Sequence, residues 1–312
     1  MTGFRTRRAQ CFQLKSAVQV AGVLMGLVWL LNLFAKYPNA KNNQPLPTVG
    51  KVMMIYGGNN TLYERAIETH QEHSRRLGYP LFILQREILD GVWNKYAILL
   101  SVLLQELAKP SDQRLQWLFW FDSDTVVMNP HMKLETFLPP VEADHVHLLL
   151  TKDWNGMNNG VFPIRVHPWS VQLLSAALAY PVVKPEVFLF WPDQSALANV
   201  LNENEHFARS VVYCPLRWFN AYMRSPDGES LNPDSPAELQ FHPGDLLVHF
   251  PGTPRDHLAE TLGPYLAIAE AHRAEWEPTA ENTGYPEETV NFWRKQSSMP
   301  SNVDSTHWRG EN

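Results

Sequence analysis

The chain has 312 residues, a hydrophobic content of 45% and a formal net charge of −6. Residues 1–41 contain six basic and no acidic side chains, so the remainder carries 20 basic and 32 acidic residues, a net charge of −12. An acidic body of this kind argues against nucleic acid as a partner, and the length of the chain is enough for one large α/β domain or two small ones.

The basic start precedes an uncharged stretch at residues 16–35, whose 20 residues are about what a membrane-spanning helix needs. The basic residues before it predict a cytosolic tail at 1–15 and a lumenal body. A cleaved signal peptide is the alternative, but the apolar stretch is long for one and no strong cleavage site follows it. A stem rich in Pro and Asn is predicted at 36–50, and the N-glycosylation sequon at Asn59 fits a lumenal body.

Apolar runs and turn signals predict a β-α-β-α-β order in the first half of the body, followed by a fourth strand. In chain order the predicted elements are Lys51–Tyr56, Leu62–Leu77, Pro80–Leu84, Trp93–Leu107, Trp117–Phe121 and His145–Leu150. This alternation is typical of a mainly parallel α/β sheet with helices on its faces. Later elements are expected at Pro168–Ala179, Pro192–Leu201, Gly244–Phe250 and Leu258–Glu275. The polar composition after residue 276 predicts a partly disordered tail at 277–312.

The strand predicted at Trp117–Phe121 ends in two carboxylates one residue apart, Asp122 and Asp124. Open α/β sheets bind their ligands at the carboxyl ends of strands. Two like charges there are unfavourable unless a cation or hydrogen-bond donors compensate them. A divalent ion such as Mg²⁺ or Mn²⁺ that bridges to a substrate phosphate is the simplest compensator. The alternative is that both residues only cap the following turn.

Further groups are candidates for the same site. His249 ends a predicted strand and would complete a set of two Asp and one His suited to Mn²⁺, although a structural histidine is the alternative. The loop at 154–160, rich in Gly and Asn, offers amide donors for ligand hydroxyls or is an ordinary turn. Asp193 and Gln194 begin a helix, where donors gather, or Asp193 simply caps it. Lys95 reaches a phosphate or extends to solvent. Candidates for stacking on sugar faces, with core packing as the alternative, are Trp154, Trp191, Trp218, Phe219 and Tyr222.

Taken in order, these segments resemble glycosyltransferase family 34, the Golgi α-galactosyl-, α-mannosyl- and α-xylosyltransferases. The resemblance is carried by Trp93-x-Lys95, Asp122-Ser123-Asp124, Asn158-Asn159-Gly160-Val161-Phe162-x-Ile164-Arg165, Trp169-Ser170, Asp193-Gln194-Ser195 and His249-Phe250-x-Gly252. It implies a GT-A catalytic domain at 51–276 in a type II protein of the Golgi membrane. The implied reaction is a Mn²⁺- or Mg²⁺-dependent transfer from UDP-galactose or GDP-mannose to a mannose-containing glycan. A transferase complex or a homodimer is compatible with this resemblance.

Matched residue by residue, the resemblance implies that Asp122, Asp124 and His249 are metal ligands. It places Gln194, with Asp193 beside it, near the reacting carbon of the donor sugar. The positions that match the donor pocket are Lys95, Asp122, Ser123, Asp153, Asn159 and Gly252. No carboxylate is clearly placed as a nucleophile, so we expect a reaction on one face of the sugar. In that reaction the departing phosphate takes the acceptor proton and Gln194 stabilises the transient cation.

Two other readings fit parts of the sequence. The segment Phe121–Val126 also matches the D-x-D-x-T/V loop of haloacid-dehalogenase-type phosphatases, but His249 stands where the second acidic pair of those enzymes needs an Asp after Asp245. A non-catalytic sugar-binding subunit of a membrane transferase complex is the other alternative, since a metal site can bind a sugar nucleotide without turning it over. Release of nucleoside diphosphate would distinguish a transferase from such a subunit.

Overall fold

The computed structural model describes residues 46–56 and 60–298. Among these described residues, no helix is long and apolar enough to cross a bilayer. The predicted cytosolic tail, the anchor at 16–35, the stem up to residue 45, the sequon residue Asn59 and the end of the predicted tail at 299–312 lie outside the described residues.

The predicted elements occur in the predicted order, but four strands were not predicted, at Thr125–Val127, Gly156–Asn158, Val161–Arg165 and Val211–Cys214. The helices and strands are β1 (Val49–Met54), α2 (Thr61–Leu77), β2 (Leu81–Leu84), η1 (Gly91–Trp93), α3 (Asn94–Leu107), β3 (Trp117–Phe121), β4 (Thr125–Val127), η2 (Leu134–Phe137), β5 (Leu148–Asp153), β6 (Gly156–Asn158), β7 (Val161–Arg165), α4 (Pro168–Val183), α5 (Pro192–Glu203), α6 (Glu205–Ala208), β8 (Val211–Cys214), η3 (Leu216–Trp218), η4 (Ala237–Leu239), β9 (Leu247–His249), α7 (Leu258–Glu270), η5 (Ala280–Asn282) and α8 (Tyr285–Ser298). The strand predicted at His145–Leu150 lies three residues later, as β5, and α7 ends before the predicted Glu275.

Seven strands form one sheet in the order β2-β1-β3-β7-β5-β6, with β8 also paired to β5. The pairs β1–β2, β1–β3 and β5–β8 are parallel, whereas β3–β7, β5–β7 and β5–β6 are antiparallel. The prediction of a mainly parallel sheet is therefore only partly confirmed. The chain reverses after β5 in a tight hairpin in which Asp153 faces Gly156, whose φ of 102° suits glycine.

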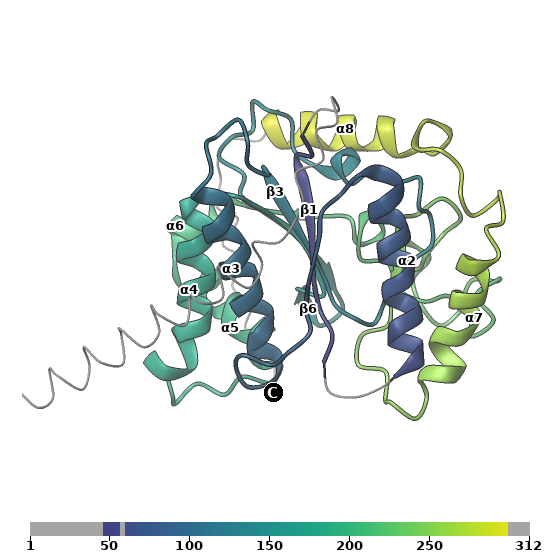
Figure 1. Ribbon diagram of the computed structural model, residues 1–312, viewed down its shortest axis with the longest axis horizontal. Helices are drawn as coiled ribbons and strands as arrows, with labels where there is room; N and C mark the ends of the chain where they lie inside the picture. The colour runs from purple at the N-terminus through teal and green to yellow at the C-terminus, as the bar shows by residue number, and fades with distance from the viewer. Residues whose placement is uncertain (1–45, 57–59, 299–312) are drawn as a thin grey trace, which may run out of the picture. The chain divides into compact units, whose positions relative to one another are not determined.

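Both faces of the sheet are buried, as the uninterrupted apolar run of β3 predicts. Leu118 and Trp120 pack into one hydrophobic cluster, whereas Trp117, Phe119 and Phe121 pack into a second cluster on the other face. Alternate side chains of a strand point to opposite faces, so a strand covered on both sides is apolar throughout. Figure 1 shows α3, α4 and α5 over one face, α2 and α7 on the other side, and α8 across one end.

The prediction of a polar, partly disordered tail from residue 277 is wrong for residues 285–298, which form α8. Tyr285, Thr289 and Trp293 lie four residues apart, so they share one helix face, and all three are buried. Tyr285 and Trp293 belong to the second hydrophobic cluster. The tail composition hid this narrow apolar face because most of the other α8 side chains are polar.

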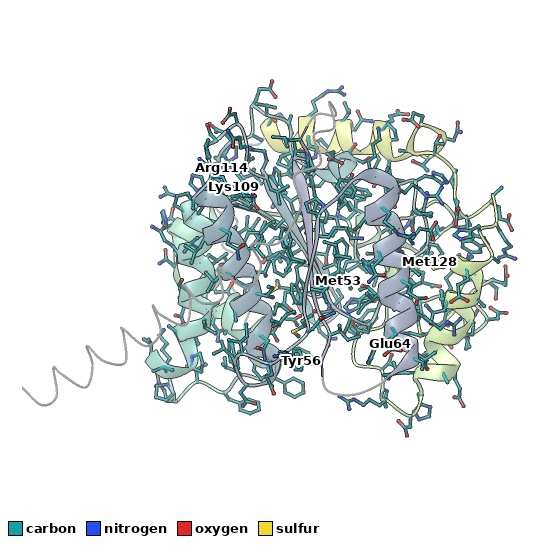
Figure 2. The ribbon with its side chains drawn as sticks, in the orientation of Figure 1. Met53, Tyr56, Glu64, Lys109, Arg114 and Met128 are labelled. Carbon is teal, nitrogen blue, oxygen red and sulfur yellow. The ribbon has the colours of Figure 1, made fainter. Side chains whose placement is uncertain are left out.

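A two-stranded sheet formed by β4 and β9 lies beside the carboxyl end of β3. Figure 2 shows Tyr56, which follows β1, at one end of the molecule and Arg114, which precedes β3, near the opposite end. Because β1 and β3 run parallel, the Tyr56 end is the end at which the Asp122–Asp124 segment leaves the sheet.

Candidate functional site

The carboxyl end of the sheet opens into a cleft of about 610 Å³. Segments after β1, β3 and β9, the β5–β6 hairpin and the first turn of α5 contribute to its walls. The cleft is lined by the residues predicted to bind metal or donor or to act in catalysis: Lys95, Asp122, Ser123, Asp124, Asp153, Asn159, Asp193, Gln194, His249 and Gly252. Of the five candidates for stacking on sugars, Trp154, Trp191 and Tyr222 line it too. The prediction is wrong for Trp218 and Phe219, which are fully buried in the second hydrophobic cluster. The fold therefore brings together groups from distant parts of the chain, while their roles stay predictions.

Among the described residues, one group of three could hold a metal ion. A carboxylate oxygen of Asp122, one of Asp124 and an imidazole nitrogen of His249 all lie within 4.8 Å of one another. The pairing of β4 with β9 explains this, because Thr125 lies directly opposite His249. The Phe250 N–H donates to the Asp124 carbonyl at 3.0 Å, and Thr125 Oγ1 donates to the Asp122 carbonyl at 2.6 Å. The loop that carries both carboxylates is thus held against β9.

The imidazole of His249 is oriented by a chain of amide hydrogen bonds that starts at a backbone N–H. The Gly160 N–H donates to Asn158 Oδ1 at 2.8 Å, and this oxygen also accepts from Asn220 Nδ2 at 2.9 Å. Asn220 Oδ1 therefore faces His249 Nδ1, 2.8 Å away, so Nδ1 carries the proton and donates it. The Nε2 lone pair is then free and lies 3.4 Å from Asp124 Oδ1. Neutral histidine binds metals in this form.

Lys95 is a buried cation beside the three candidate ligands. Its Nζ lies 3.1 Å from Asp122 Oδ1 and 2.8 Å from Asp193 Oδ2, and it donates to the Asn159 carbonyl at 3.2 Å. Burial lowers the pKa of Lys95, but Asp122 and Asp193 outweigh burial and raise this pKa above its ordinary value. Lys95 therefore does not extend to solvent, because its single charge is shared between two carboxylates.

Asp122 is subject to opposing influences. Burial raises the pKa of its carboxyl group, Lys95 lowers it, and Asp124 raises it again, so that the pKa lies above its ordinary value. Trp120 Nε1 donates to Asp122 Oδ1 at 2.7 Å, which fixes this oxygen. Lys95 therefore compensates the pair of carboxylates only in part. Two carboxylates and a neutral imidazole are a donor set that fits a divalent ion such as Mn²⁺.

Asp153 ends β5 and is held by the neighbouring aromatic side chain of Tyr222. The Tyr222 hydroxyl donates to Asp153 Oδ2, and Asn158 Nδ2 donates to the same oxygen at 3.1 Å. Burial, followed by the hydrogen bond to Asp153, raises the pKa of Tyr222 above its ordinary value. Trp154 is 62% exposed and packs edge-to-face on Tyr222, with ring centroids 5.2 Å apart. One wall of the cleft is thus aromatic and well ordered by hydrogen bonds.

Asp193 and Gln194 lie in the first turn of α5 and also line the cleft. The N-cap position belongs to Trp191, so the idea that Asp193 caps the helix is wrong. Its carboxylate points inward instead, to Lys95 and to Asn159 Nδ2 at 3.0 Å. Gln194 Oε1 accepts from the Asn159 N–H at 3.2 Å. Asn159 therefore links the positions that the sequence predicts separately.

Two residues that the sequence prediction did not single out, Asn220 and Trp120, support the site, together with Gly160 of the predicted loop at 154–160. Asn220 orients His249, and Trp120 holds Asp122. Gly160 lies against the His249 ring, since a Cβ atom placed there would be 2.2 Å from His249 Cε1. No local signal marks Asn220 or Trp120, because one lies in an irregular segment and the other in an apolar strand.

The sequence profile of the galactosyl transferase GMA12/MNN10 family matches residues 140–256. The probable alpha-1,2-galactosyltransferase gmh1 of Schizosaccharomyces pombe is 24% identical over 198 residues, which are 53% of this chain and 54% of that protein. The probable alpha-1,6-mannosyltransferase MNN10 of Saccharomyces cerevisiae is 28% identical over 193 residues, 50% of this chain and 47% of that protein. The chain thus spans about half the length of these two curated relatives.

A solved structure resembles the fold. The crystal structure of a glycosyltransferase involved in the glycosylation of the major capsid of PBCV-1 superposes with a TM-score of 0.51 and 15% identity, covering 70% of this chain and 99% of that one. This likeness concerns the fold alone, a mixed α/β sheet flanked by helices. The family match covers the part of the chain that contains Asp193, Gln194 and His249. Over residues 140–256 the chain is similar to the galactosyl transferase GMA12/MNN10 family, and over about half its length it is similar to these two fungal glycosyltransferases.

Proposed function

We propose that this protein is a retaining, metal-dependent GT-A glycosyltransferase that moves galactose or mannose from UDP-galactose or GDP-mannose to a mannose-containing glycan. The observation that carries the proposal is the convergence of Asp122, Asp124 and His249 within 4.8 Å in the cleft at the carboxyl end of the sheet. The names of the fungal relatives, an α-galactosyltransferase and an α-mannosyltransferase, support the choice of sugars.

Asp122, Asp124 and His249 would hold the metal, for which Mn²⁺ is favoured because the donor set mixes carboxylate oxygens with an imidazole nitrogen. When bound, a divalent ion there supplies the positive charge that a nucleoside diphosphate leaving group needs. Asn220 keeps His249 in the tautomer with a free Nε2. Lys95 lowers the negative charge of the site by pairing with Asp122 and Asp193.

We propose that the sugar configuration is retained because the acceptor attacks, and the phosphate departs, on the same face of the sugar ring. Asp193 is bound by Lys95 and Asn159, and Asp153 is bound by Tyr222 and Asn158, so neither carboxylate is a free nucleophile. This favours a reaction in which the acceptor hydroxyl bonds to the anomeric carbon as the bond to the phosphate breaks. The acceptor proton passes to the departing phosphate, and Gln194 Oε1 stabilises the positive charge at the anomeric carbon.

The cellular setting follows from the sequence. We propose a single-pass type II protein of the Golgi membrane, with the anchor at 16–35 and the cleft in the lumen. The uncharged stretch and the basic residues before it support this topology.

The test uses the full-length chain in detergent with Mn²⁺, a panel of UDP- and GDP-sugars and α-methyl mannoside as acceptor. We expect release of nucleoside diphosphate from one donor, abolished by EDTA and by Asp124→Ala. Asp112→Ala, which removes an exposed aspartate remote from the cleft, should retain full activity. Transfer by Asp124→Ala at the wild-type rate would contradict the metal scheme.

Negative results also discriminate between the alternatives. Phosphatase activity on simple esters without transfer would favour the haloacid-dehalogenase-type reading. The structure disfavours this reading, because Asp245 pairs with Arg217 and Tyr285 and does not line the cleft. Binding of a nucleotide sugar without turnover would favour a non-catalytic subunit of a transferase complex.

A further inference from the structure

The segment between α4 and α5 exposes three aromatic rings in a row. Phe188, Phe190 and Trp191 are 84%, 68% and 43% exposed. The rings of Phe188 and Phe190 are 6.4 Å apart and those of Phe190 and Trp191 are 4.7 Å apart, both edge-to-face. We call these three side chains the aromatic row. Single exposed apolar side chains are common on protein surfaces, whereas a contiguous group of exposed aromatic side chains is typical of a binding surface.

The backbone beneath the aromatic row is anchored. Val187 and Leu189 alternate with the exposed rings and pack against the hydrophobic cluster on the α3–α5 side of the sheet. The Trp191 N–H donates to Ser195 Oγ at 3.2 Å, which ties the end of the segment to α5. Val187 and Leu189 thus pack against the core, whereas Phe188 and Phe190 are exposed, so core packing does not explain why aromatic residues occupy these two positions.

The aromatic row is continuous with the cleft. Trp191 lines the cleft together with Gln194, three residues further along the chain, and Trp154 lines the same cleft. α4 follows β7, which ends opposite the start of β3, so the helix leads from that far end of the sheet back to the cleft. The row therefore leads outward from the place where Gln194 and the three candidate metal ligands meet.

We infer that the aromatic row binds the acceptor glycan as an oligosaccharide, with sugar rings stacked beyond the residue that receives the transferred hexose. This inference rests on the proposed transferase function. Pyranose rings present flat C–H faces that pack on aromatic rings and hydroxyl groups that stay hydrated at the rim. Glu186, exposed in the same segment, offers a hydrogen-bond acceptor for such hydroxyls.

Charge and position favour a glycan over a membrane surface. Residues 185–191 contain no Lys or Arg, and Lys184 pairs with Glu203 at 2.5 Å, whereas segments that bind anionic bilayers combine aromatic with basic side chains. The aromatic row also adjoins the cleft through Trp191, the position that an acceptor glycan requires.

The test replaces Phe188 and Phe190 with serine in the full-length chain, since neither ring belongs to a hydrophobic cluster. Transfer to α-linked mannotetraose is compared with transfer to α-methyl mannoside. We expect the ratio of kcat/KM for the long acceptor to that for the short one to fall about tenfold, the effect of losing two aromatic contacts. Calorimetric binding of mannotetraose without donor should weaken by a similar factor.

Val141→Ser is the matched control, because Val141 is 89% exposed and lies outside the cleft. It should leave the ratio and the binding unchanged. An unchanged ratio in the double variant would overturn the inference. A loss of activity seen only in proteoliposomes would indicate that the aromatic row binds a bilayer. A changed oligomeric state with an unchanged kcat/KM ratio would indicate that it binds a second copy of the chain. Either result would contradict the inference.

The same experiment separates the two proposals. If the wild-type chain turns over no donor, the transferase proposal fails, and the calorimetric titration still decides whether the aromatic row binds the oligosaccharide. If turnover is normal and the double variant binds mannotetraose as tightly as the wild type, the transferase proposal stands and the aromatic row is not an acceptor site.

Discussion

Replacing Gly160 with alanine would test the metal site through packing alone. A Cβ atom at this position would lie 2.2 Å from His249 Cε1 and 2.9 Å from each ring nitrogen. Gly160 does not have a positive φ, so alanine is compatible with its backbone conformation. The substitution removes no hydrogen-bonding group and no candidate ligand, and it acts on the position of the imidazole.

The magnitude follows from these distances. Carbon atoms in contact stay about 3.5 Å apart, so the ring must retreat by roughly 1.3 Å from its 2.2 Å starting distance. Metal–ligand distances tolerate only about 0.2 Å. Disturbing the groups that orient a ligand weakens metal binding by about 10- to 100-fold, and we expect Gly160→Ala to approach the upper value, about 2.7 kcal/mol. Overpacking should cost about 1–3 kcal/mol of stability.

Calorimetric titration of the full-length chain with Mn²⁺ measures the effect, and urea unfolding shows that the variant is folded. Gly263→Ala in α7 is the matched control, because a Cβ atom there meets nothing within 4 Å. It should leave Mn²⁺ binding unchanged and add about 0.5–1 kcal/mol of stability, since alanine favours a helix over glycine. A folded Gly160→Ala protein with wild-type Mn²⁺ affinity would refute the role of His249 as a metal ligand.

Three further predictions concern stability, each measured by urea unfolding. Lys95→Met leaves the buried Asp193 and the partly buried Asp122 uncompensated and should cost about 3–5 kcal/mol. Lys184→Met removes a partly exposed ion pair and should change stability little, so equal effects would contradict the role given to Lys95. Burial lowers the pKa of His147 to about 4, so the folded protein favours the neutral imidazole. The free energy of unfolding therefore has its full value from His147 above about pH 6.5, the pKa of an unfolded histidine, and falls by up to about 3 kcal/mol as the pH decreases towards 4. His147→Gln should therefore reduce the loss of stability between these pH values, and an unaltered pH profile would exclude the contribution. Trp293→Ala should cost about 3 kcal/mol because it empties a buried position of α8, and a change below about 0.5 kcal/mol would mean that α8 does not contribute to the core.

Local signals in the sequence were sufficient for most elements. The β3 strand at Trp117–Phe121 has the predicted bounds, because a strand buried on both faces must be apolar at every position. The end of α2 at Gly78 was equally predictable, since its φ of 77° is left-handed. The helix α8 was missed because burial of three side chains in a polar sequence depends on the surface that they meet.

The candidate site was predictable as a set of residues but not as an arrangement. The family motifs name the residues, and the fold places them in one cleft because each ends a strand or begins a helix at the same edge of the sheet. Their proposed roles in donor and metal binding stay predictions.

By itself, the sequence determined the acidic character of the body, the bounds of the buried strand β3 and the set of polar residues that line the cleft. Each of these depends on composition or on residues a few positions apart. Only the tertiary structure decided that His249 lies opposite Thr125, that Asn220 sets its tautomer, and that Lys95 is bound to carboxylates. These relations join segments far apart in the chain, and they depend on strand register and on which polar groups are buried together, which no local pattern specifies.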